Sequence, residues 1–170
     1  MAAFGFLDIC DFNALLEKTP ERHADARDII EFLYHTGWRS AEAKNLQWSW
    51  VDDNIIRLPE EFSKNKKERV MPISGVVMDV LARRTKLRRL DCPYVFHRNS
   101  KPIKSFRRLF KMAAKEINHP ELLPHDMRRS AVRNFRKSGW SEGDGMMLRS
   151  QDEIGLRDTT SAMTRTPSRQ

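Results

Sequence analysis

The 170 residues suffice for one domain of ordinary size, and a hydrophobic content of 39% is enough to form a core. A net charge of +8 at pH 7 favours a polyanionic partner, the alternative being a basic protein whose charge serves only solubility. The sequence has no apolar run of the roughly 18–20 residues that a membrane span needs and no signal-peptide pattern, so we expect neither a membrane partner nor secretion.

Apolar periodicity predicts three helices in the first third of the chain, over residues 12–18, 21–35 and 41–46. Asp11 and Ser40 precede the first and third of these, where a short polar side chain can cap the helix. Gly37 is expected to end the second helix, because glycine readily adopts the left-handed conformation found there. The second helix is expected to bury Ala26, Ile29, Ile30, Leu33 and Tyr34.

The middle of the chain predicts a small sheet and two further helices. Strands are expected over residues 54–58 and 69–73, joined by the basic loop 63–68, with a third brief strand at 93–96. Helices are expected over 74–89, capped by Ser74, and over 105–118. The basic residues of the first of these helices are expected mostly in solvent: Arg83, Arg84, Lys86, Arg88 and Arg89.

The positive charge is concentrated in one part of the chain. Residues 1–62 carry 6 Lys or Arg against 12 Asp or Glu, whereas residues 63–138 carry 21 against 6. Beyond about Gln151 the apolar periodicity fades, and we expect residues 151–170 to be poorly ordered. The second part of the chain is therefore the part suited to an anionic partner.

The residues from Leu123 to Gly139 combine a loop with a basic helix that begins at a proline and ends at a glycine. His125 and Arg128 are three residues apart, so they should lie on one helix face, roughly 5–6 Å apart at Cβ. Such a pair suits an anionic oxygen, most plausibly that of a phosphate. The alternative is a general nucleic-acid-binding helix, in which His125 is only a cap.

Two other basic positions are candidates for the same chemistry. Arg39 lies between two helices, and Glu42 could orient it or could simply favour the first turn of the next helix. Lys64 lies in the basic loop with Lys66 and Lys67, where a lysine can reach DNA and donate a proton. The alternatives are a surface arginine and a solvated turn that touches phosphate without specificity.

Together these segments resemble the catalytic domain of the tyrosine recombinases, the phage integrase family. The matching motifs, in order and spacing, are Thr36-Gly-Trp-Arg39 with Glu42, the Lys64 loop up to Pro72, Val95-Phe96 and His125-Asp-Met-Arg128. The resemblance covers about residues 6–148. It implies a mainly α fold with a small antiparallel β-sheet, and a catalytic domain within residues 1–150.

The resemblance also implies an activity, namely DNA strand cleavage and rejoining for site-specific recombination or integration through a covalent phosphotyrosine. Arg39 and Arg128 would bind the scissile phosphate, Lys64 would protonate the leaving 5′ oxygen, and His125 would assist proton transfer. Lys66, Lys67, Arg129 and Arg133 are candidates for further phosphate contacts. The implied partners are double-stranded DNA and further copies of the chain, and no metal or nucleotide cofactor is implied.

The sequence departs from the family pattern in two respects. Few residues precede the catalytic segment, so we expect the family's amino-terminal DNA-clamping domain to be absent. Ser150 and Gln151 stand where the family has Gly-His. Thr160 stands near the position of the nucleophilic tyrosine, so we expect the chain to be catalytically inactive, as a DNA-binding fragment or regulator would be. One hypothesis is that residues 151–170 are an out-of-frame translation, since suitable codons restore family-like residues in shifted frames.

The two cysteines indicate a cellular compartment. Cys10 and Cys92 are far apart and have no metal-ligand spacing. We expect both to be free thiols in a reducing cytoplasm.

Overall fold

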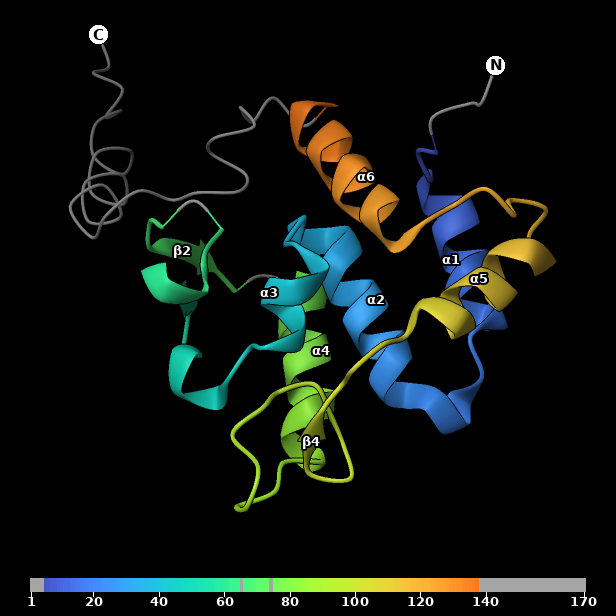
Figure 1. Cartoon of the computed structure of the whole chain (residues 1–170). Coiled ribbons are helices and arrows are strands. Elements are labelled where there is room, and N and C mark those ends of the chain that lie inside the picture. Colours follow the sequence, from blue (N-terminus) through green and yellow to red (C-terminus); the bar gives the residue numbers. More distant parts are fainter. Residues whose placement is uncertain (1–4, 65, 74, 138–170) are drawn as a thin grey trace, which may run out of the picture.

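The structure of the chain, a computed structural model, describes residues 5–64, 66–73 and 75–137. These residues form a mainly helical domain with a small amount of antiparallel sheet, as the sequence predicted, and the sheet consists of two separate short hairpins (Figure 1). The α-helices are α1 (Ile9–Lys18), α2 (Ala24–Thr36), α3 (Ser40–Lys44), α4 (Gly75–Lys86), α5 (Arg107–Glu116) and α6 (Pro124–Lys137). The strands are β1 (Ile55–Leu58), β2 (Arg69–Pro72), β3 (His97–Arg98) and β4 (Lys101–Pro102). The predicted disorder of residues 151–170 lies outside the described residues.

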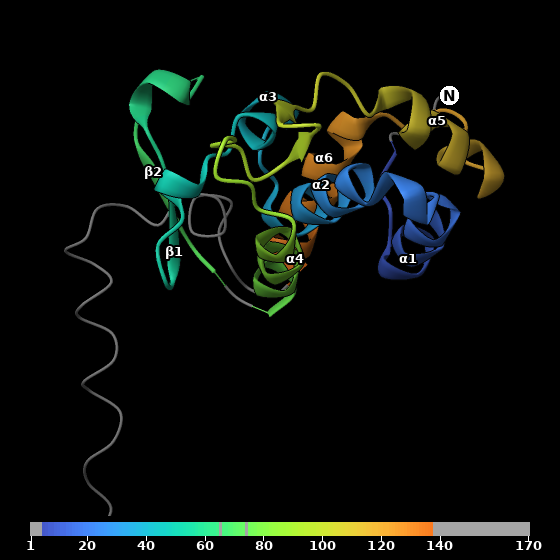
Figure 2. The same ribbon diagram turned by 90° about the horizontal axis from the view of Figure 1, so that it is seen from below.

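Helix α2 is the centre of the domain and packs against α1, α3, α4 and α6. The α1–α5 pair lies at one end of the molecule and the β1–β2 hairpin at the other (Figure 2). All five apolar residues of α2 that the periodicity assigned to the core are buried, and Phe32 joins them. Because α2 is covered on several sides, its ends are fixed and can position neighbouring side chains.

The predicted β1–β2 hairpin is confirmed, with Ile56 opposite Met71 and Leu58 opposite Arg69. The prediction of a third strand at residues 93–96 was wrong. In that segment Tyr94 forms only an isolated bridge to Gln47, and the regular pairing is between β3 and β4. Val95 and Phe96 are completely buried, so an apolar run that reads as a strand serves here to fill the core.

Several helix boundaries differ from the sequence-based expectation. Asp8, not Asp11, caps α1, because its carboxylate accepts the Asp11 backbone amide at 2.9 Å. Arg39, not Ser40, is the N-cap of α3. Gly37 ends α2 with φ of 64°, as expected. The predicted cap Ser74 lies outside the described residues.

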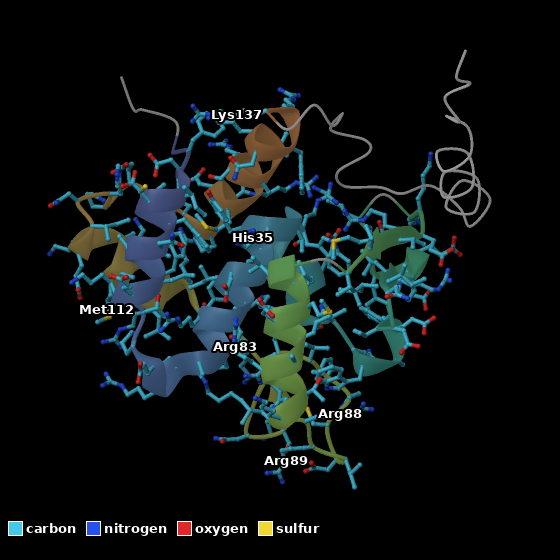
Figure 3. The ribbon with its side chains drawn as sticks, turned by 180° about the vertical axis from the view of Figure 1, so that it is seen from behind. His35, Arg83, Arg88, Arg89, Met112 and Lys137 are labelled. Atoms are coloured by element: carbon cyan, nitrogen blue, oxygen red, sulfur yellow. The ribbon has the colours of Figure 1, made fainter. Side chains whose placement is uncertain are left out.

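The expectation that Arg84 faces solvent was wrong. Arg84 is 2% exposed, and it donates to the backbone carbonyls of Val95 and His97 at 3.1 and 3.4 Å. Its third partner is the buried Asp28 of α2, at 3.6 Å. Figure 3 shows the neighbouring Arg83 beside α2, where it also bonds Asp28 at 2.9 Å. These arginines join α4 to α2, whereas Arg88 and Arg89 lie exposed beyond the C-terminal end of α4 (Figure 3).

Candidate functional site

The turn between α2 and α3 holds Arg39 in a defined position. Its guanidinium donates to Glu42 Oε1 at 3.0 Å, and its backbone amide donates to Glu42 Oε2 at 3.0 Å. The Arg39 side chain is 29% exposed, while that of Glu42 is 3% exposed. A buried carboxylate thus orients a guanidinium that still reaches solvent.

Sequence reasoning missed the second partner of Glu42. Arg69, the first residue of β2, is buried, donates to Glu42 Oε2 and lies with its guanidinium 5.5 Å from the centre of the Trp38 ring. Burial by itself raises the pKa of Glu42, but the Arg39 backbone hydrogen bond and the charges of Arg69 and Arg39 outweigh it. They hold the pKa of Glu42 below its ordinary value of 4.5, so the carboxyl is ionised at neutral pH.

Arg128 joins α6 to the same turn. Its guanidinium donates to the backbone carbonyl of Gly37, a residue 91 positions earlier in the chain. Gly37 is two residues before Arg39, so two guanidinium groups from distant parts of the sequence meet at one turn. Two such groups can bind the oxygens of one phosphate, since guanidinium donors match its geometry.

The start of α6 is fixed by residues that the sequence did not single out. Asp126 is buried and accepts the Leu123 backbone amide at 2.9 Å and the guanidinium of Arg129 at 3.1 Å. Ser130 is completely buried, and its hydroxyl accepts the Leu7 amide at 2.9 Å. The sequence did contain a signal for these contacts, because Asp126 and Ser130 lie one and five positions after His125 and can form hydrogen bonds near the start of the helix. His125 itself is exposed, one helical turn before Arg128.

The other predicted residues lie around this cluster. The loop of the β1–β2 hairpin exposes Lys64, Lys66 and Lys67. None of the contacts described joins these lysines to Arg39 or Arg128. Arg133 is exposed on α6, and its guanidinium lies 5.2 Å from the centre of the Phe6 ring. The structure therefore brings together Arg39, Glu42 and Arg128, and leaves the lysines on a separate element.

The described residues contain neither a metal-ligand cluster nor a membrane-spanning helix. No group of three or more His, Cys, Asp or Glu side chains there could hold a metal ion. None of the helices described is long and apolar enough to cross a membrane. Cys10 and Cys92 are free thiols, the first exposed and the second buried.

Known proteins share this fold. XerA recombinase superposes with a TM-score of 0.70 at 20% identity, covering 86% of this chain and 57% of its own. The lambda integrase catalytic core gives 0.72 at 16% identity, covering 86% and 94%, respectively. The Tn1549 transposon integrase, solved with circular intermediate DNA, gives 0.66 at 17% identity, covering 86% and 58%.

These identities are low, so the structural matches establish the shared fold. The chain spans little more than half the length of the XerA chain it resembles. No curated protein sequence matches the chain. Residues 6–144, however, match the phage integrase family, which is most of the chain. The chain therefore belongs to the phage integrase family.

Proposed function

We propose that the chain takes part in site-specific DNA recombination by holding a backbone phosphate of double-stranded DNA between Arg39 and Arg128. The observation that carries the proposal is the hydrogen bond from Arg128 to the Gly37 carbonyl, which sets two guanidinium groups at one turn. Glu42 supports it, because its ionised carboxylate orients Arg39 while leaving part of the guanidinium exposed.

The proposed chemistry follows from these positions. Arg39 and Arg128 bind the two nonbridging oxygens of the phosphate, and in a site that includes a tyrosine nucleophile they would also offset the charge of a pentavalent transition state. With such a nucleophile present, Lys64 would donate a proton to the departing 5′ oxygen, and His125 would assist proton transfer from the tyrosine hydroxyl. Lys64 is exposed on the β1–β2 hairpin, so its side chain is accessible to bound DNA. Further phosphate contacts come from Lys66, Lys67, Arg129 and Arg133.

We also propose that these 170 residues do not cleave DNA themselves, and so act as a DNA-binding fragment or regulator. The sequence has two tyrosines, Tyr34 and Tyr94. Tyr34 is 2% exposed, its ring stacks on Phe12, and its hydroxyl donates to the Leu7 carbonyl at 3.4 Å. Burial raises the pKa of the Tyr34 phenol, which disfavours the phenolate that attack would need.

The proposed partners are duplex DNA and further copies of the chain. Lambda integrase has been solved as a dimer bound to a core DNA site and as a tetramer bound to a Holliday junction, which supports self-association on DNA. We propose that the protein acts in a reducing cytoplasm, which the free thiols of Cys10 and Cys92 support.

Binding to labelled duplexes of randomised sequence tests the phosphate site. Arg39→Ala and Arg128→Ala should each weaken binding about tenfold or more, because a charge-assisted contact is lost. Arg22→Ala removes an equal charge from an exposed turn and should have little effect. Circular dichroism establishes that each variant is folded. Equal, small losses in all three variants would favour a diffuse basic surface.

A pool of nicked duplexes tests the absence of cleavage. Cleavage through a tyrosine leaves the protein covalently joined to DNA, and this adduct survives denaturing electrophoresis. We expect no adduct from the chain. An adduct that persists would contradict the inactive assignment, and its loss in Tyr34→Phe or Tyr94→Phe would identify the nucleophile.

A further inference from the structure

A basic pocket lies next to the turn between α2 and α3 that holds Arg39. It encloses about 280 Å³ between α3, the loop from β4 to α5, and the start of α6. Its polar lining residues are Ser40, Lys44, Lys104, Ser105, Arg107 and His125. Three segments that are distant in sequence therefore contribute hydrogen-bond donors to one concave surface.

The charge of this pocket is not neutralised. Its nine lining residues include no Asp or Glu. Within the described part of the chain, no carboxylate forms an ion pair with Lys44, Lys104 or Arg107. Lys44 is held in place, since its ammonium donates to the Lys104 carbonyl at 3.2 Å. Like charges that gather without counter-charges are suited to an anionic ligand.

The pocket adjoins the Arg39–Arg128 site along two elements. Ser40 directly follows Arg39, and His125 lies three residues before Arg128 on α6, a rise of about 4.5 Å along the helix. In B-form DNA one strand carries a phosphate for about every 3.4 Å of helix axis. A strand whose phosphate lies at the two arginines can therefore bring a neighbouring phosphate to the pocket.

We propose that this pocket binds a second backbone phosphate of the same DNA strand, within one or two nucleotides of the phosphate held by Arg39 and Arg128. Lys104 and Arg107 supply the charge, and the hydroxyls of Ser40 and Ser105 are available as donors. The proposal rests on the proposed function of the arginine site. Two adjacent phosphate contacts fix the strand in direction as well as position, which a single contact cannot do.

The test compares two double variants with the same change of charge. Lys104→Gln with Arg107→Gln alters the pocket, whereas Lys101→Gln with Arg108→Gln alters exposed neighbours that do not line it. Affinity for a randomised 20-base-pair duplex is measured over a range of salt concentrations. The pocket variant should bind at least about tenfold more weakly than wild type, and its salt slope should fall by about one to two units. The neighbour variant should keep nearly the wild-type slope.

Two outcomes would overturn the proposal, and each differs from failure of the arginine site. Equal losses in both double variants would mean that the pocket is only part of a diffuse basic face. Saturable binding of inorganic phosphate that the pocket variant abolishes, with DNA affinity unchanged, would identify a site for free phosphate. Arg39→Ala and Arg128→Ala are measured in parallel. If they reduce DNA affinity while the pocket variant does not, the proposed function stands and the second phosphate site fails.

Discussion

Replacement of Glu42 by glutamine tests the central ion cluster. Glutamine has the same shape, but it leaves the guanidinium of Arg69 buried with no carboxylate. Arg69 Nε already has no hydrogen-bond partner within the described structure, so little is available to compensate. Removal of one member of a buried ion pair costs about 3–5 kcal/mol. We expect the lower end, about 3 kcal/mol, because the glutamine carbonyl retains one acceptor.

The loss should depend on pH in a defined direction. The pKa of Glu42 is lowered in the folded protein, so its contribution to the free energy of unfolding is complete above the ordinary pKa of 4.5. The contribution is lost as the pH falls through the lower, folded pKa. There the wild-type carboxyl becomes protonated and resembles glutamine. The difference between Glu42→Gln and wild type should therefore be largest at pH 7 and should shrink well below pH 4.5.

Urea unfolding followed by tryptophan fluorescence at several pH values measures this difference. In thermal unfolding at neutral pH, the melting temperature should fall by about 6–12 °C, given about 2–4 °C per kcal/mol for a domain of this size. Glu61→Gln, at an exposed position, is the matched control and should change stability by less than about 0.5 kcal/mol. A loss below about 1 kcal/mol at pH 7, or a loss that does not vary with pH, would refute the reasoning.

Three further substitutions probe the elements that position the site. Gly37→Ala should cost about 1–2 kcal/mol, because alanine disfavours the left-handed conformation with φ of 64°; an unchanged melting temperature would contradict this. Ser130→Ala should cost about 1–3 kcal/mol and speed hydrogen exchange at the Leu7 amide, which loses its acceptor; exchange at the wild-type rate would argue against that bond. Arg84→Met should cost about 3–5 kcal/mol in urea unfolding, since it leaves buried carbonyls without a donor, whereas Arg88→Met removes only a contact with the Trp48 ring and should cost under about 1 kcal/mol; similar losses in both would contradict the burial of Arg84.

The local sequence determined the helices and the β1–β2 hairpin of this domain. Helix α2 and its end at Gly37 follow from apolar residues at helical spacing and from glycine's freedom at positive φ. The β1–β2 hairpin follows from two short segments joined by a charged loop, the first of which alternates between buried and half-buried residues. His125 and Arg128 lie one turn apart because both are on α6. Each of these features lies within one short stretch of chain, the longest being the hairpin from Ile55 to Pro72.

Tertiary structure decided which charged side chains are buried. Arg84 and Arg69 look like surface residues in sequence, because arginine is costly to bury unless partners compensate its lost hydration. Their partners come from distant elements: Asp28 and two backbone carbonyls for Arg84, and Glu42 for Arg69. The contact of Arg128 with Gly37 likewise spans 91 residues. The sequence by itself specified the two guanidinium groups of the candidate site, whereas only the packing of α6 against α2 brought them to one turn.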